Sequence, residues 1–247
     1  MDRSICTFYQ KIGACRHGEK CSRKHVKPSE SKTVLLANLY QNPKVSTNEN
    51  ETMSEKQAAE AFDHFYSDIF KKMAESGEVE RIVVCENENF HLSGNVYVRF
   101  TTTQAAGNAV ILLNQEWYGG RPVYCELSPV TSFQEANCRA HDTNSCTRGD
   151  HCNFMHVIRP TDELRARLRQ AQEKQIALSK IRMVMGDENW GRKWEEPSSE
   201  TYKREAHPQI AGGTINIAEE EADIEKSEII EVEDSKVNLV AKLFGKE

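Results

Sequence analysis

Hydrophobic and polar positions alternate most regularly in the middle of the chain. An apolar run over residues 33–40 predicts a short buried strand, and a polar loop follows it. Ser54 is the predicted N-cap of a helix, with Gln57 three residues on in a capping-box arrangement, and Gly77 ends the helix. Apolar residues at helical spacing give this helix a core face: Ala58, Phe62, Phe65, Ile69 and Met73.

The pattern continues with two strands, a second helix and a closing strand. Apolar-rich segments predict strands over 81–87 and 94–100 and a helix over 103–114. Residues 121–127 form the last predicted strand. The order β-α-β-β-α-β is that of the split βαβ fold of an RNA-recognition motif. Residues 30–130 are therefore predicted to form one small RNA-recognition-motif-like domain of the α+β class.

The rest of the chain is too polar to extend this core. Only 38% of the 247 residues are hydrophobic, and the mean hydropathy is -0.66. No run of about 18 apolar residues occurs, so neither a transmembrane helix nor a membrane partner is expected. The N-terminus carries no apolar signal segment. An intracellular protein is expected, where disulfides are rare, so the eight cysteines need another explanation.

Six cysteines and two histidines repeat one spacing on either side of the predicted domain. The first group is spaced C-x8-C-x5-C-x3-H and the second C-x7-C-x5-C-x3-H. Thiolates and one imidazole suit tetrahedral zinc, and a closed site supplies the folding energy that such short polar segments lack. Cys85 and Cys125 lie in predicted strands and are expected to be buried small side chains. Two zinc ions are expected, held by Cys6, Cys15, Cys21 and His25, and by Cys138, Cys146, Cys152 and His156.

Both ligand groups resemble the CCCH zinc finger, a class that binds single-stranded RNA. Such fingers have little regular structure and use backbone groups, aromatic rings and Arg side chains to contact bases. An Arg can pair with phosphate, hydrogen-bond guanine or stack on a base. Aromatic, basic and small polar residues surround both groups. The candidate RNA-binding residues are Phe8, Arg16, Ser22, Arg23, Arg139, Arg148 and Phe154.

Charge is distributed unevenly along the chain. Residues 1–29 carry seven Lys or Arg against two Asp or Glu, and residues 131–185 carry nine against six. Residues 30–130 carry eight against fourteen, and the tail from 186 carries eight against sixteen. Basic finger segments around an acidic middle domain indicate two kinds of partner, one a polyanion and the other basic.

The predicted domain departs from RNA-recognition motifs that bind RNA on their sheet. The usual octapeptide K/R-G-F/Y-G/A-F/Y-V-x-F/Y stands here as SGNVYVRF over 93–100. Asn95 replaces the first aromatic residue, and Leu35 occupies the aromatic position of the first strand. Tyr97 is the stacking ring that remains. Because the domain is also acidic, we expect that its sheet does not bind RNA.

The domain more closely resembles the U2-auxiliary-factor homology motif, which binds a protein. That motif holds a basic, Trp-containing peptide between its acidic first helix and a loop before the last strand. The family's Arg-x-Phe in that loop is Glu116-Trp117-Tyr118 here, so the Arg is replaced. Trp117 is expected to be an exposed partner contact, the alternative being a lid over the small core. The resemblance implies a partner-binding surface of Glu60, Asp63, Asp68, Trp117 and Tyr118.

The arrangement of finger, peptide-binding domain and finger resembles the small-subunit family of the U2 auxiliary splicing factor. Matching stretches within roughly residues 6–160 include FYQKIGACRHGEKCSRKH, GEVERIVVCEN, RPVYCELSPVTSF and CTRGDHCNFMH. The resemblance implies a nuclear pre-mRNA splicing protein whose fingers recognise the AG dinucleotide of the 3′ splice site. It also implies a heterodimer with the large subunit, formed through the middle domain, and promotion of U2 snRNP recruitment. The family's double cysteine is Asn137-Cys138 here, which leaves Cys138 as the candidate ligand.

The predicted organisation has five segments. They are a first finger over 1–28, the RNA-recognition-motif-like domain over 30–130, a second finger over 132–160, a basic helix over 161–185 and an acidic, mostly disordered tail over 186–247.

Two other functions remain open on the sequence. One is a zinc-stabilised scaffold for protein interactions. The other is a CCCH regulator of another RNA step such as mRNA decay, although decay fingers stand closer together in sequence. An enzyme is not expected, because each Cys/His group fills a closed four-ligand site and no phosphate-cradling glycine loop or nucleophile elbow occurs.

Overall fold

The computed structural model describes residues 4–43 and 54–191 of the chain. Both predicted fingers, the domain between them and the helix after the second finger fall largely within these ranges. From residue 192 onwards the predicted acidic tail lies outside the described residues.

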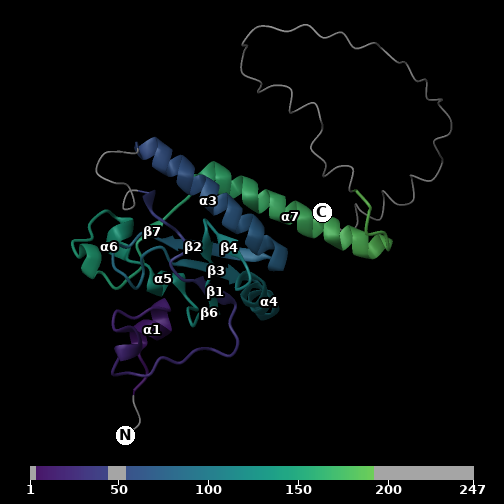
Figure 1. Ribbon diagram of the computed structural model, residues 1–247. Helices are drawn as coiled ribbons and strands as arrows, with labels where there is room; N and C mark the ends of the chain where they lie inside the picture. The colour runs from purple at the N-terminus through teal and green to yellow at the C-terminus, as the bar shows by residue number, and fades with distance from the viewer. Residues whose placement is uncertain (1–3, 44–53, 192–247) are drawn as a thin grey trace, which may run out of the picture. The chain divides into compact units, whose positions relative to one another are not determined.

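A five-stranded antiparallel sheet lies at the centre of the described part of the chain (Figure 1). In spatial order β6-β1-β3-β2-β7, the strands are Cys125–Leu127, Thr33–Leu36, Val96–Phe100, Val79–Cys85 and Val157–Ile158. The chain that leaves the second finger adds β7 at the edge, where Val84 pairs with Ile158. The other four strands and two helices follow the predicted order, so the RNA-recognition-motif-like α+β domain is confirmed.

Helices α3 (Glu55–Ser76) and α4 (Thr103–Leu113) cover one face of the sheet. The predicted capping box is present: the Ser54 hydroxyl accepts a hydrogen bond from the Gln57 N–H, and the Gln57 side chain accepts one from the Ser54 N–H. The predicted core face of α3 is buried along its length. Within the described ranges, no helix is apolar over a stretch long enough to cross a membrane.

The closing strand is shorter than predicted because a small hairpin precedes it. β5 (Arg121–Pro122) pairs with β4 (Trp117–Tyr118), and β6 begins only at Cys125. Pro122 has no N–H to donate to a longer ladder. The Asn114 side chain accepts a hydrogen bond from the Cys125 N–H at 2.9 Å and donates one to the Cys125 carbonyl at 2.8 Å. This amide fixes where β6 starts.

Helix α7 (Asp162–Met185) coincides with the predicted basic helix and packs beside α3 (Figure 1). Leu164 and Leu168 join the core between α3 and the sheet. The Gln172 side chain accepts a hydrogen bond from the Val79 N–H at 2.9 Å and donates one to the Val79 carbonyl at 3.0 Å. The amide thus takes the place of a neighbouring strand and covers an otherwise open sheet edge.

The finger segments cover the opposite face of the sheet. α1 (Thr7–Ile12) packs beside α5 (Phe133–Ala136), and α6 (Arg139–Asp142) follows in the second finger. Gly13 ends α1 with φ +75°, and a Cβ there would lie 2.7 Å from the Ser128 hydroxyl oxygen and 3.0 Å from the Tyr97 ring. The two sides of this interface share a second buried cluster that includes Ile12, Phe133, Met155, Leu35, Val83 and Tyr97.

Candidate metal centres and nucleic-acid interface

The four predicted ligands of each finger come together. Within each group the donor atoms all lie within 4.8 Å of one another. The Cys15 sulfur lies 3.8 Å from the sulfurs of Cys6 and Cys21, and the sulfurs of Cys138 and Cys152 are 3.7 Å apart. Thiolates bound tetrahedrally to zinc at about 2.3 Å have sulfur atoms about 3.8 Å apart. The predicted ligand sets are therefore confirmed as two groups that can each hold a zinc ion.

The chemistry of the donor atoms also fits a metal. The Nε2 atoms of His25 and His156 are buried and have no hydrogen-bond partner in the described part of the chain. A buried unpartnered nitrogen costs free energy, and coordination to zinc would remove that cost. Burial raises the pKa of Cys15 and of Cys152 to about 11. A bound dication favours the thiolate form that such burial opposes.

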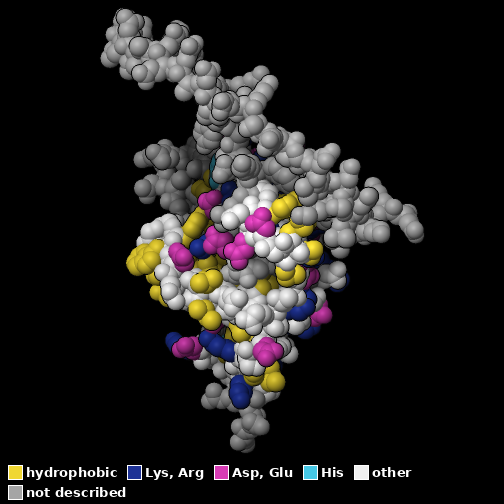
Figure 2. All heavy atoms as spheres, turned by 90° about the vertical axis from the view of Figure 1, so that its right-hand side faces the viewer, with side chains coloured by type: hydrophobic (Ala, Val, Ile, Leu, Met, Phe, Trp, Pro, Cys, Tyr) yellow, Lys and Arg dark blue, Asp and Glu magenta, His cyan; other side chains and the backbone are white. Residues whose placement is uncertain are grey.

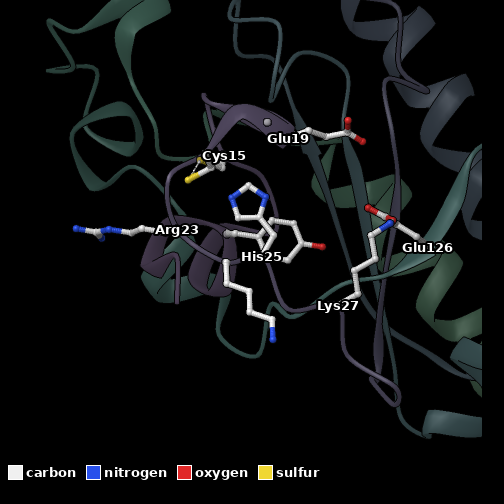
Figure 3. Close-up of a pocket in the computed structure, with 10 residues that line it drawn as sticks. Cys15, Glu19, Arg23, His25, Lys27 and Glu126 are labelled. Carbon is white, nitrogen blue, oxygen red and sulfur yellow. Dashed lines mark hydrogen bonds and ion pairs between the residues drawn. The ribbon is translucent and has the colours of Figure 1, made fainter. Parts of the chain in front are cut away.

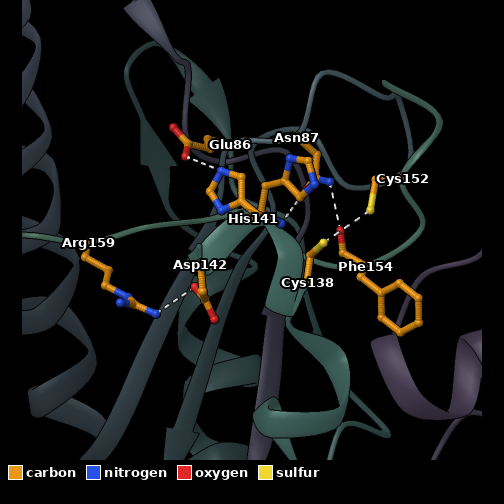
Figure 4. Close-up of polar contacts among 9 residues, drawn as sticks. Glu86, Asn87, Cys138, His141, Asp142, Cys152, Phe154 and Arg159 are labelled. Atoms are coloured by element: carbon orange, nitrogen blue, oxygen red, sulfur yellow. Dashed lines mark hydrogen bonds and ion pairs between the residues drawn. The ribbon is translucent and has the colours of Figure 1, made fainter. Parts of the chain in front are cut away.

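A ring stacks on the histidine ligand of each finger. The Tyr9 ring lies 4.5 Å from that of His25, and the His141 ring lies 4.2 Å from that of His156. His141 Nε2 is also 3.1 Å from the Glu86 carboxylate of the middle domain (Figure 4). Each stacked ring stands three residues after the first cysteine ligand of its finger. A ring at this position is therefore a sequence signal for a side chain that stacks on the histidine ligand, and the spacing of the ligands alone does not reveal it.

A cleft of about 820 Å³ lies between the two fingers. Phe8 of α1 lines this cleft and is 43% exposed, and Phe154 lines the cleft from the second finger. The Phe154 ring points away from the cysteine sulfurs in Figure 4. Lys11 contributes from the first finger, and the exposed Arg139 and Arg148 contribute from the second. The structure thus brings four of the predicted RNA-binding residues into one aromatic and basic cleft.

The other three predicted RNA-binding residues lie outside this cleft. Arg23 lines a separate cavity of about 710 Å³ around the ligands of the first finger. In that cavity Lys27 reaches the Glu126 carboxylate at 2.7 Å, and Arg23 points the other way (Figure 3). Arg16 and Ser22 are exposed and line neither space.

The sheet face on which RNA-recognition motifs stack bases is closed by the fingers. Tyr97 is fully buried, and Leu35 and Asn95 are 5% and 6% exposed. The Asn95 side chain accepts a hydrogen bond from the Asn38 N–H and donates one to the His91 carbonyl. None of these three positions can present a ring to a base. This geometry supports the expectation that the sheet does not bind RNA.

The predicted partner surface gathers beside the β4–β5 hairpin. Trp117 is 70% exposed, so it is not a lid over the core. The half-buried Tyr118 packs edge-on against Phe65 of α3, with ring centres 5.7 Å apart. Burial and the negative charge of Asp68 raise the pKa of Tyr118, so Asp68 lies near the phenol. Seen from the side of α4, acidic side chains group near the centre of the surface with hydrophobic ones around them (Figure 2).

The acidic residues of α3 have different neighbours. The Asp63 carboxylate accepts hydrogen bonds from the backbone N–H of Thr161 at 3.0 Å and from its hydroxyl at 2.6 Å. Asp63 therefore holds the start of α7. Glu60 is exposed, and its carboxylate lies 3.8 Å from the Lys56 ammonium. Asp68, rather than Asp63, lies near Tyr118.

The replaced Arg of the loop motif has a local counterpart. The Glu116 carboxylate lies 3.2 Å from the Lys72 ammonium of α3, which is also 3.1 Å from Glu75. The loop therefore carries the negative charge of this contact and the helix the positive one. Surface pairs of this kind contribute about 0–1 kcal/mol, so the contact adds little to the stability of the fold.

The two cysteines outside the ligand groups are structural. Cys85 is fully buried and Cys125 is 6% exposed. Burial raises the pKa of Cys125 to about 12 and raises that of Cys85 as well. The prediction that both are buried small side chains is confirmed, because neither is accessible or forms a thiolate at neutral pH.

Fold and ligand sets together define a protein with two CCCH zinc fingers packed on an RNA-recognition-motif-like domain. Residues 1–27 and 133–158 match the family described as "Zinc finger C-x8-C-x5-C-x3-H type (and similar)". The "Splicing factor U2AF 23 kDa subunit" of Schizosaccharomyces pombe is 53% identical over 178 residues, which cover 72% of this chain and 82% of that protein. The "Splicing factor U2AF 26 kDa subunit" of Homo sapiens is 43% identical over 167 residues, covering 66% and 76% respectively. The chain belongs to the family of U2AF small-subunit splicing factors.

The solved structure titled "Structure of RNA15 RRM" is also similar, at 18% identity and a TM-score of 0.26, covering 40% of this chain and 92% of that one. Family membership confirms the predicted resemblance. The named relatives are splicing factors, a non-enzymatic class.

Proposed function

We propose that this chain recognises the AG dinucleotide of the 3′ splice site and binds the large subunit of the U2 auxiliary factor. The two fingers read the RNA, and the middle domain holds the partner. Together the two interactions would promote recruitment of the U2 snRNP in the nucleus.

The observation that carries the RNA part is the cleft between the fingers. Phe8 and Phe154 offer faces on which bases can stack, and such stacking is worth about 1–3 kcal/mol per base. Arg139 and Arg148 offer guanidinium groups that can pair with phosphate or with the N7 and O6 acceptors of guanine. Because the fingers are fixed side by side on the sheet, the cleft is formed before RNA arrives, which lowers the entropic cost of binding.

The partner part is supported by the surface beside the β4–β5 hairpin. The exposed Trp117 is followed by the half-buried Tyr118, which lies near Asp68, and this set suits a basic peptide that brings its own aromatic ring. Because Trp117 lies on the hairpin and Phe8 on a finger, the proposal gives RNA and protein separate surfaces. If the chain were instead a scaffold for protein interactions that does not bind RNA, the aromatic and basic cleft would have no role.

An Arg148→Ala variant tests the RNA part. Its affinity for a single-stranded RNA containing UAGG, measured by fluorescence anisotropy, is expected to fall by roughly tenfold because one charged base or phosphate contact is lost. Arg167→Ala, which removes the same charge from the exposed side of α7, is the matched control and should bind as the unaltered protein does. Equal affinities for both variants, with two zinc ions retained, would contradict the proposed RNA site.

A further inference from the structure

The loop between β2 and β3 carries an aromatic side chain that the fold does not use. Phe90 is 82% exposed, the highest value among the large hydrophobic side chains of the described residues. Removing a Phe side chain from water is favourable, and the folded chain leaves this ring in contact with water. The ring is therefore available to a ligand.

The loop is held firmly against the second finger. The Asn87 side chain donates to the Phe154 carbonyl at 3.0 Å and accepts from the His156 N–H at 2.8 Å. The Asn89 side chain donates to the Cys152 carbonyl at 2.8 Å. These bonds flank Phe90 on its N-terminal side and fix the backbone from which the ring projects. A ring on a fixed backbone binds with a smaller entropic cost than one on a free loop.

The same loop also reaches the first finger. Leu92 is fully buried in the cluster that contains Ile12 of α1. The His91 ring lies 5.5 Å from the Phe90 ring, edge to face. Phe90 thus stands on a loop that contacts both fingers.

We propose that Phe90 is a stacking platform for one nucleotide of the single-stranded RNA that continues beyond the cleft. The inference rests on the proposed function, because it requires RNA in that cleft. An exposed ring on a fixed backbone suits a nucleotide, because a base can stack on its face. Every base has a π-face, so this contact adds affinity without base preference.

The test compares three single-stranded RNAs: a core of roughly four nucleotides containing AG, and the same core extended on its 5′ or its 3′ side. Anisotropy titrations of the full chain would use the unaltered protein, Phe90→Ala, Phe90→Tyr and Phe8→Ala. We expect Phe90→Ala to bind the core normally and to lose roughly tenfold in affinity for one of the extended RNAs. Phe90→Tyr keeps the stacking face and should bind all three RNAs as the unaltered protein does.

The Phe8→Ala variant separates the two proposals. It should weaken binding of all three RNAs, because Phe8 lies in the cleft itself. If Phe8→Ala is weakened while Phe90→Ala binds every RNA normally, the Phe90 proposal is wrong and the proposed function stands. If the unaltered protein binds none of the RNAs, both are wrong. Loss of core binding in Phe90→Ala would also overturn the inference, since Phe90 would then act within the cleft or on folding.

Discussion

At the scale of single residues, each metal centre depends on four donor atoms that lie within 4.8 Å of one another. Ligand spacing along a short loop is local information, and the spacing of all eight ligands led directly to the observed groups. The stacked rings of Tyr9 and His141 and the exposed ring of Phe90 were not predicted. Their roles depend on which surface a side chain faces, and that is set by contacts between distant segments.

Replacing Cys21 with Ser should remove the zinc of the first finger. A neutral hydroxyl is a poor substitute for a thiolate, and apparent zinc-binding free energies of about 10–16 kcal/mol are what hold such short segments folded. We expect metal analysis to find one zinc ion per chain in Cys21→Ser. Cys125→Ala, which changes a cysteine outside both ligand groups, should retain two. Two ions in Cys21→Ser would show that the first ligand set is misassigned.

At the scale of elements, the sequence predicted the two helices of the middle domain and the basic helix after the second finger. The capping box at Ser54 and the core face of α3 follow from local sequence, and both are present. The division of the closing strand was missed because it depends on a contact between Asn114 and Cys125. The hairpin that precedes the shortened strand carries Trp117. The prediction therefore missed an element that belongs to the proposed partner-binding surface.

Removing the Trp117 ring should weaken binding to the partner and leave the fold intact. The side chain is largely exposed, so Trp117→Ala should alter the free energy of unfolding by no more than about 0.5 kcal/mol. Calorimetric titration with a basic, Trp-containing peptide should show an affinity lower by roughly tenfold or more, as for a hot-spot residue. The matched control is Tyr124→Ala, which removes another exposed ring. Unchanged peptide affinity in Trp117→Ala would place the partner surface elsewhere.

At the scale of the whole molecule, both fingers pack on the sheet face that other RNA-recognition motifs use to bind RNA. Leu35 and Asn95 were recognised as poor stacking positions, whereas Tyr97 was expected to remain as a stacking ring; the structure buries all three. The position of α7 along the sheet edge was likewise not predicted, since amphipathic pattern does not specify the surface on which a helix packs. Long-range packing thus creates the cleft from local motifs.

The central claim is that this cleft reads AG. The most direct test is the affinity of the full chain, bound to a peptide from the large subunit, for two short RNAs that differ only in UAG or UAC before a final G. A single lost base contact should weaken UAC binding by roughly tenfold at constant salt. Equal binding to both RNAs would contradict splice-site reading and leave a nonspecific RNA-binding protein.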